Sequence, residues 1–308
     1  MTISDKKLNI AIIGYGKWAI NYISTIYNSP IATIKWIVSR NKIVKDNHSL
    51  NSKVIKDWRD LFTEEGIDGI IVAVPPEFQC DIALRCMDEN IPLLLEKPLA
   101  LDTDTVDLLL TKCENNNSKV MVGYTYLYHQ AYRKILELVH LIGPIKEIVS
   151  TGGNYGPFRD TCSVLWDWAP HDVSMCVKLM NDFPLVVNSK KKYVNNKSTQ
   201  GEIIETSLLF SNGVKASLTF GNGMLHKKRL FKVIGDSGEL VFDDLLQTKL
   251  VLLTGSQYKE IPVNTKSPLE VLTGEFFEMI HRADKSCFDV AFSNSVTKVI
   301  SDIEYSLS

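Results

Sequence analysis

The sequence lacks an excess of charge of either sign, closely spaced cysteines and any long apolar run. Its 34 Lys and Arg residues against 36 Asp and Glu residues leave a net charge of −2, which gives no electrostatic basis for binding nucleic acid or an anionic membrane. The six cysteines contain no C-x-x-C pair, which favours reduced thiols over a disulfide framework or a zinc site.

The hydrophobic residues are spread through the chain in short groups. No run approaches the roughly 18 apolar residues of a transmembrane helix. Residues 1–7 also lack the apolar core of a signal peptide. We therefore expect a cytoplasmic protein that does not associate with membranes and binds no metal.

The first 122 residues alternate between short apolar runs and stretches with helical periodicity. Short links between alternating strands and helices predict a parallel sheet covered on both faces. Buried strands are predicted at residues 8–13, 34–38, 67–74, 92–95 and 120–123, and helices at 17–27, 79–89 and 102–113.

Residues 123–308 follow a different pattern and are predicted to form a second domain, of the α+β class, with a large, mostly antiparallel open sheet. Hairpin signals such as Ser211-Asn212-Gly213 separate its strands. Its alternating strands hold more apolar positions than helices on one face can cover, so we expect a homodimer or homotetramer. Strands are predicted at residues 145–151, 203–210, 214–220, 230–234, 239–242 and 249–253, and helices at 129–141, 269–283 and 291–305.

A glycine-rich turn follows the first predicted strand. It reads Gly14-Tyr15-Gly16-Lys17-Trp18-Ala19 and matches G-x-G-x-x-A, a loose form of the dinucleotide-binding fingerprint. Gly14 would allow a tight turn, and Gly16 would leave room for a pyrophosphate at the helix N-terminus. These residues predict a dinucleotide-binding Rossmann domain over residues 1–122.

The end of the second predicted strand bears on the choice of cofactor. An acidic residue there would bind the ribose 2′-hydroxyl of NAD, but the chain reads Ser39-Arg40. A hydroxyl and a guanidinium suit a 2′-phosphate. We therefore predict NADP, with NAD as the alternative if Arg40 is only a solvated surface residue.

Two further predicted strands end at the rim where ligands of open α/β sheets bind. Val74-Pro75-Pro76 ends one of them, and prolines have no N–H to leave unsatisfied against a cofactor, although a plain strand stop explains them equally well. Glu96-Lys97-Pro98 ends the next strand. Lys97 could reach a substrate that lies on the nicotinamide, and Glu96 could orient or balance its ammonium.

A third cluster reads Trp166-Asp167-Trp168-Ala169-Pro170-His171-Asp172. One helical turn would put Asp167 and His171 on the same side. Because proline is tolerated in the first turn of a helix, the helix is predicted to begin near Leu165 or Trp166. A carboxylate beside a histidine suits proton transfer to or from a hydroxyl. A helix cap beside a satisfied histidine is the alternative.

Together these motifs resemble the Gfo/Idh/MocA oxidoreductases, named for glucose–fructose oxidoreductase and inositol dehydrogenase. The resemblance covers most of the chain and rests on Gly14-Tyr15-Gly16, Val72–Pro76, Glu96-Lys97-Pro98 and the D-x-x-x-H of Asp167 and His171. It implies a Rossmann domain followed by an open antiparallel sheet that commonly forms an oligomer interface. It also implies that His171 is the acid/base, that Lys97 binds and polarises the reacting oxygen, and that Asp167 belongs to the catalytic set.

The chain departs from the family pattern at three places, which leaves the substrate open. Glu77-Phe78-Gln79 replaces a common N-x-x-H, Ala169 replaces a glycine, and residues 123–128 lack an arginine often found there. We predict an NAD(P)-dependent oxidoreductase that moves a hydride between nicotinamide and a hydroxyl or ketone carbon of a sugar or nucleotide sugar. The alternatives are a reductase of a non-sugar ketone, enone or imine, and a non-catalytic NAD(P)-binding sensor. The side chains predicted to line the substrate pocket are Tyr124, Tyr126, Tyr155, Arg159 and Trp166.

Overall fold

The computed structural model describes residues 7–40, 52–159, 162–196, 199–282 and 288–308. The chain forms two compact units. Residues 1–123 and 269–294 make up the first, and residues 124–268 and 295–308 make up the second. The chain passes from the first unit to the second near residue 122. Residues 269–294 return to the first unit, so one boundary does not separate the two.

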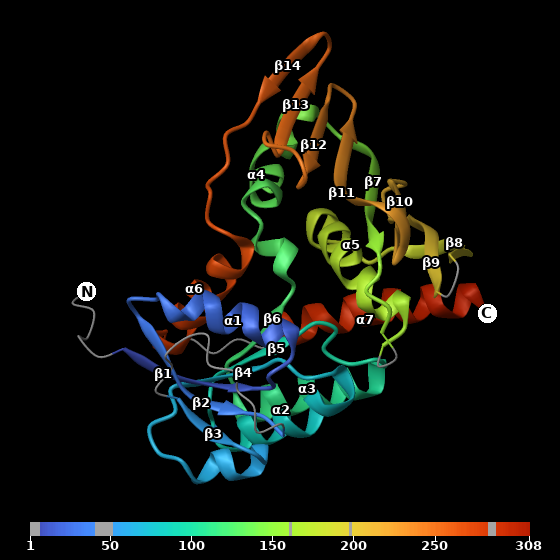
Figure 1. Ribbon diagram of the computed structural model, residues 1–308. Coiled ribbons are helices and arrows are strands. Elements are labelled where there is room, and N and C mark those ends of the chain that lie inside the picture. The colour runs from blue at the N-terminus through green and yellow to red at the C-terminus, as the bar shows by residue number, and fades with distance from the viewer. Residues whose placement is uncertain (1–6, 41–51, 160–161, 197–198, 283–287) are drawn as a thin grey trace. The chain divides into compact units, whose positions relative to one another are not determined.

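The first unit contains a six-stranded, all-parallel sheet in the order β3-β2-β1-β4-β5-β6. Figure 1 shows α2 and α3 on one side of this sheet and α1 and α6 on the other. This arrangement confirms the predicted Rossmann-type fold. The strands are β1 (Leu8–Ile13), β2 (Ala32–Val38), β3 (Lys53–Ile55), β4 (Gly69–Val72), β5 (Leu93–Glu96) and β6 (Val120–Gly123), and the helices are α1 (Lys17–Tyr27), α2 (Gln79–Asp88), α3 (Thr103–Asn116) and α6 (Pro268–His281).

Apolar residues at helical spacing explain how these helices cover the sheet. In α1 the buried residues are Ala19, Tyr22, Ile23 and Ile26, which share one face. In α3 the Asp102 carboxylate accepts the Thr105 N–H at 2.7 Å, which is the predicted N-cap. Short 3₁₀ helices, η1 (Trp58–Thr63) and η2 (Pro76–Phe78), complete the links between strands.

Residues 269–294 join the first unit through specific contacts. An ideal Cβ at Gly69 would lie 3.1 Å from the Phe276 ring of α6, so a glycine lets this helix approach β4 closely. At the edge strand β6, the Val122 N–H donates to Asp289 at 3.2 Å. The Lys119 ammonium donates to the Ile280 carbonyl at 2.9 Å.

The second unit contains an eight-stranded sheet in the order β14-β13-β12-β11-β7-β10-β9-β8. Its pairings are antiparallel except that β10 runs parallel to β7, so the expected mostly antiparallel sheet is confirmed. The strands are β7 (Ile145–Tyr155), β8 (Leu185–Asn196), β9 (Thr199–Leu209), β10 (Lys215–Gly221), β11 (Gly223–Gly235), β12 (Glu239–Asp243), β13 (Leu250–Thr254) and β14 (Gln257–Glu260).

Two helices pack against this sheet. Helix α5 (Val164–Met180) lies along β7 and β10, and α4 (Gln130–Leu138) lies against β12 (Figure 1). The predicted helix at 129–141 is divided into α4 and a 3₁₀ helix, η4 (Val139–Ile142), and another 3₁₀ helix, η3 (Thr125–Tyr128), precedes it. The last helix, α7 (Phe288–Leu307), contributes its residues from Ser295 onward to the second unit.

Helix α5 begins earlier than the position of its proline predicted. Ser163 is its N-cap and its hydroxyl accepts the Trp166 N–H, so Pro170 lies inside the helix rather than in its first turn. Pro170 cannot donate to the Trp166 carbonyl, which costs one helical hydrogen bond. Proline is therefore accommodated here beyond the first turn.

The cysteines correct one expectation. Cys80, Cys86 and Cys176 are free thiols, as the sequence suggested. Cys113 is disulfide-bonded, so the expectation of reduced thiols is wrong at this position. Disulfide pairing depends on which cysteines the tertiary fold brings together, and sequence spacing does not reveal that.

Candidate active site

The glycine turn after β1 is built for a close backbone approach. Gly14 has φ +110°, and an ideal Cβ there would lie 2.3 Å from the Ala73 carbonyl oxygen, so no other residue fits. An ideal Cβ at Gly16 would meet nothing within 4 Å. Gly16 is the N-cap of α1 and provides no side-chain cap for its first N–H groups. The first backbone N–H groups of α1 therefore face open space and have no side-chain cap. This is the arrangement that binds a dinucleotide phosphate.

The predicted cofactor residues follow the carboxyl ends of four adjacent parallel strands. In the order of the sheet these are Arg40 after β2, Gly14 after β1, Pro75 after β4 and Lys97 after β5. Because parallel strands end at one edge, these residues share one rim of the first unit. Tyr15, Lys17 and Trp18 follow Gly14 there, and Val74 and Pro76 flank Pro75.

Arg40 lies at the outer part of this rim. Its guanidinium carbon stands 5.6 Å from the centre of the exposed Phe78 ring, a cation–π contact between the end of β2 and η2. The neighbouring Ser39 is buried, and its N–H donates to the Ile55 carbonyl at 2.9 Å. The aromatic contact holds the positive charge of Arg40 beside the second strand.

Glu96 is a buried carboxylate at the end of β5, with 7% of its surface exposed. Both Trp18 Nε1 and the Tyr22 hydroxyl donate to its Oε1 atom. Burial raises the pKa of Glu96 to about 7, although these two hydrogen bonds and the charge of Lys97 each lower it. Lys97 itself is half-buried between Glu96 and the buried Pro98.

Glu96 has a further role besides the one that the sequence suggested. Its side chain binds α1 through Trp18 and Tyr22, and Gly123 leaves it room, because an ideal Cβ there would lie 3.1 Å from Oε1. Glu96 therefore joins the glycine turn to the strand that carries Lys97. Both elements belong to the first unit.

His171 and Asp167 lie one turn apart on α5 in the second unit. His171 is half-buried, and Asp167 Oδ2 forms an ion pair with Arg159 Nε at 3.2 Å. Arg159 was predicted as a substrate residue, and here it reaches the carboxylate predicted to act with His171. This places three of the predicted site residues in one cluster.

His171 also lines a small pocket between α5 and the sheet. Tyr126 meets its ring edge-to-face, with ring centres 5.1 Å apart. Burial raises the pKa of Tyr126 to about 12, so its hydroxyl stays protonated at neutral pH. The lining residues are Tyr126, Thr151, Gly152, Trp168, His171, Asp172, Met175, Arg229, Leu230, Phe231 and Phe242.

The other predicted pocket residues lie elsewhere in the second unit. Tyr124 is 2% exposed, and Trp166 is 4% exposed. The Trp166 indole N–H donates to Glu304 of α7 at 3.2 Å, so this side chain secures two helices to each other. Tyr155 packs edge-to-face on Phe158 at 5.2 Å, near the end of β7.

Among the pocket residues to which the sequence assigned no role are Trp168, Asp172 and Arg229. Asp172 is 5% exposed, and Ser150 Oγ donates to its Oδ1 atom. Burial raises the pKa of Asp172 to about 6, although Ser150 and the charge of Arg229 each lower it. A carboxylate among the apolar residues of a helix was a sequence signal for Asp172, whereas nothing near Arg229 marks it.

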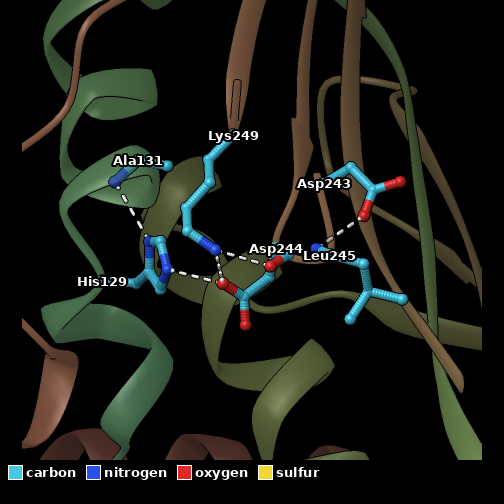
Figure 2. A network of polar contacts seen from close by, with 6 residues as sticks. All are labelled: His129, Ala131, Asp243, Asp244, Leu245 and Lys249. Atoms are coloured by element: carbon cyan, nitrogen blue, oxygen red, sulfur yellow. Dashed lines mark hydrogen bonds and ion pairs between the residues drawn. The ribbon is translucent and has the colours of Figure 1, made fainter. Parts of the chain in front are cut away.

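A polar network supports Tyr126 from its other side. The His129 and Tyr126 rings stack 6.4 Å apart, with a 14° angle between them. Figure 2 shows that His129 Nδ1 accepts the Ala131 N–H and Nε2 contacts Asp244, both at 3.1 Å. Because Nδ1 is an acceptor, Nε2 carries the proton and donates a hydrogen bond to Asp244. Lys249 also donates to Asp244 Oδ1, at 2.7 Å.

Neither a metal centre nor a membrane span is found in the parts of the chain that the structure describes. Across those ranges, no three His, Cys, Asp or Glu side chains gather in a way that could hold a metal ion. Within the same ranges, none of the helices combines the length and apolar character that crossing a bilayer requires.

Comparison with known proteins identifies relatives of the whole chain. Residues 8–124 match the family model GFO_IDH_MocA, described as an oxidoreductase family with an NAD-binding Rossmann fold. Oxidoreductase P35 of Formosa agariphila is 24% identical over 301 residues, which cover 89% of this chain and 92% of that protein.

Solved structures extend the similarity to both units. A protein from Magnetospirillum magnetotacticum MS-1, provisionally described as an oxidoreductase, has a TM-score of 0.86 and 27% identity, and covers 96% of this chain and 99% of its own. KijD10, a 3-ketoreductase from Actinomadura kijaniata solved with NADP and TDP-benzene, also has a TM-score of 0.86. The alignment covers 98% of each chain at 14% sequence identity, so the similarity to KijD10 shows the fold alone.

Proposed function

We propose that this chain, whose residues 8–124 match the Gfo/Idh/MocA family of NAD-binding oxidoreductases, interconverts a hydroxyl and a ketone on a sugar or nucleotide sugar. The observation that carries this proposal is the rim of the first unit, where Gly14 follows β1 and Lys97 follows β5, the two strands that flank β4. A phosphate cradle and an ammonium at one rim are what a cofactor and an oxygen-bearing substrate require together.

Different residues of the rim would bind different parts of the cofactor. Gly14, Tyr15, Gly16, Lys17 and Trp18 would hold the pyrophosphate, Ser39 and Arg40 the adenosine ribose, and Val74, Pro75, Pro76 and Glu96 the inner part of the cofactor. When bound, the nicotinamide supplies or accepts the hydride. Arg40 favours NADP over NAD, because a guanidinium pairs with a 2′-phosphate and no acidic residue stands there to repel it.

Lys97 and His171 act on the oxygen of the substrate. In the oxidation direction His171 takes the hydroxyl proton as the hydride leaves the same carbon, and in reduction it returns that proton. The Lys97 ammonium binds the oxygen and stabilises the negative charge that develops on it. Asp167 orients His171 or binds a neighbouring hydroxyl, and its ion pair with Arg159 supports either role.

The sugar class rests on polar and aromatic side chains near His171. Tyr126, Tyr155 and Arg159 offer aromatic faces and hydrogen-bonding groups of the kind that bind sugar rings. Tyr124 and Trp166 are left out of this set because they are buried and Trp166 already binds Glu304. KijD10, with the same fold, was solved with a TDP derivative, which supports a nucleotide sugar as the first substrate class to test.

The test is a panel of sugars and nucleotide sugars assayed with NADPH and NADH. With an active substrate, His171→Ala should lower turnover by about 10²–10⁴ and leave cofactor affinity intact. Lys97→Ala should also spare cofactor binding, and the double variant should be less than additive if both groups act on one oxygen. The exposed His140 and the half-buried Lys134, which pairs with Glu137, provide controls, because alanine at either position should leave turnover unchanged. Wild-type turnover in His171→Ala would show that the assignment is wrong.

A further inference from the structure

Gln79 is fully buried at the point where α2 begins, although glutamine side chains are mostly exposed in folded proteins. Its backbone N–H donates to the carbonyl of Pro76 in η2, the short helix that follows β4. Its side-chain Nε2 donates to the Pro98 carbonyl at 2.9 Å, and Pro98 directly follows Lys97. One residue of α2 therefore joins the segments that follow two neighbouring strands, β4 and β5.

The two halves of the Gln79 amide differ in what they contact. Across the residues that the structure describes, its Oε1 atom is buried and accepts no hydrogen bond. A buried oxygen that lacks a donor costs free energy, and an apolar side chain of the same length would avoid that cost. The amide cannot be turned around, because the Pro98 carbonyl can only accept. The use of a glutamine at this position therefore lies in its N–H bond to Pro98.

The backbone of Lys97 is held on both of its sides. On the N-terminal side, its N–H donates to Glu96 Oε2 at 3.3 Å, and the Glu96 carboxylate is itself bound to α1. On the C-terminal side, the Gln79 amide binds the carbonyl of the next residue, Pro98. Glu96 and Pro98 are both buried, whereas Lys97 is half-buried. The lysine side chain therefore starts from a backbone that is fixed between two packed residues.

We propose that Gln79 is a positioning residue, which holds the backbone of Lys97 in place through the Pro98 carbonyl. Gln79 acts through Lys97 and does not itself touch cofactor or substrate, because its side chain is fully buried. A displaced ammonium stabilises a developing negative charge less well, since that stabilisation depends on a preorganised position. The catalytic consequence of this arrangement rests on the proposed role of Lys97.

Hydrogen exchange tests the positioning without a substrate, because a backbone amide exchanges faster once its segment opens more readily. In the full-length protein with isotope-labelled lysine, the NMR signal that Lys97→Arg removes is the Lys97 amide. Gln79→Met keeps the length of the side chain but removes its N–H, so the Lys97 amide should exchange about 10-fold faster or more. The amide of Lys112, inside α3, should exchange as in the wild type. An unchanged Lys97 exchange rate in folded Gln79→Met would overturn the proposal.

The melting temperature separates positioning from stability. Gln79→Met removes the unpaired Oε1 atom but leaves the Pro98 carbonyl without this donor, so the two effects offset and the melting temperature should stay near that of the wild type. Gln130→Met is the matched control, because the half-buried Gln130 also begins a helix, α4, and its loss should change neither melting nor the exchange of Lys97.

Two further variants test whether the N–H bond is what matters. Gln79→Asn keeps an amide that is one carbon too short to reach Pro98, so it should repeat the faster exchange of Lys97, even if Gln79→Met does not fold. Gln79→His keeps an N–H at a similar reach, so it should return the exchange rate toward that of the wild type. Wild-type exchange in Gln79→Asn, or a folded Gln79→His that exchanges as fast as Gln79→Asn, would contradict the proposal.

Turnover distinguishes this inference from the proposed function. With an active substrate, Gln79→Met should lower kcat by about 10- to 100-fold with little change in cofactor affinity, because a misplaced ammonium slows the chemical step. Added to Lys97→Ala, it should cause no further loss, since Gln79 acts through that lysine. Wild-type kcat in Gln79→Met, together with an inactive Lys97→Ala, would reject the positioning role alone. Wild-type kcat in Lys97→Ala would reject the catalytic assignment, and the exchange rates would then decide the positioning by themselves.

Discussion

The Tyr22 hydroxyl donates a hydrogen bond of 2.5 Å to the carboxylate of Glu96, so that α1 and β5 share one buried acidic group. The two residues are 74 positions apart in the chain. Gly123 leaves the space that this pair needs. The contact joins the glycine turn of the predicted cofactor site to the strand that carries Lys97.

Glu96 should make stability depend on pH near neutrality. Its folded-state pKa of about 7 lies above the ordinary 4.5 because burial disfavours the charged form. Its contribution to stability is therefore complete below pH 4.5 and is lost as the pH rises through 7. Relative to Glu96→Gln, the wild type should lose up to about 3 kcal/mol of unfolding free energy over that range. Urea unfolding of both proteins measures this, and parallel pH profiles would contradict it.

Asp244 should show the opposite dependence. Burial raises its pKa, but the hydrogen bonds from His129 and Lys249 and their charges outweigh burial and lower it to about 2. Its contribution is present above pH 3.8 and is lost as the pH falls through 2. Asp244→Asn should cost about 1–2 kcal/mol at pH 7, and this cost should shrink below pH 4. Asp243→Asn, at the neighbouring position, is the control. An Asp244→Asn protein as stable as the wild type at pH 7 would rule out the network in Figure 2 as a source of stability.

Arg40 should determine the preference for NADPH. Replacing it with alanine removes one charge-assisted contact to a 2′-phosphate, so NADPH binding should weaken by roughly 1.5–3 kcal/mol while NADH binding stays the same. Nicotinamide fluorescence titration measures both affinities. Arg59→Ala is a matched control, since Arg59 is also exposed and also stacks on an aromatic ring. Equal affinities of the wild type for NADPH and NADH would contradict the predicted role of Arg40.

Gly16 and Gly14 should respond differently to substitution. Gly16→Val puts a side chain into open space where a pyrophosphate would lie, so the dinucleotide should no longer raise the melting temperature, while the cofactor-free protein melts as before. Gly14→Ala should lower the melting temperature of the cofactor-free protein itself, because its Cβ would meet Ala73. Normal stabilisation of Gly16→Val by the cofactor would place the phosphate elsewhere.

The strands of the second unit should support self-association. Leu185 and Tyr193 of β8 and Leu225 of β11 expose 70%, 57% and 69% of their surfaces. Exposed apolar groups on sheet strands favour an interface, so light scattering should show a dimer or tetramer at micromolar concentration. Leu225→Asp should shift this species toward monomer, whereas Leu108→Asp, on exposed α3 of the first unit, should not. A wild-type monomer under these conditions would contradict the prediction.

The strands of the first unit could be predicted because their signals are local. Each core strand is a short apolar run that ends at glycine, proline or a charged residue, and β1 and β4 to β6 are buried almost throughout. β3 was not predicted because Lys53–Ile55 is too short to show the alternation of apolar and polar residues that indicates a strand. β8 extends over Leu185–Asn196, where a polar edge strand carries little apolar alternation.

The sequence alone determined the parallel sheet, the glycine turn and the positions of Lys97, Asp167 and His171 on their elements, since each depends on residues close together in the chain. Only the tertiary structure decided which side chains surround them. His129 binds Asp244 beside Tyr126, and Glu304 accepts the indole N–H of Trp166, which the sequence had assigned to the substrate pocket. Such pairs join residues about a hundred positions or more apart. Their choice depends on which buried polar group needs a partner once the strands are in register, and no local pattern records that.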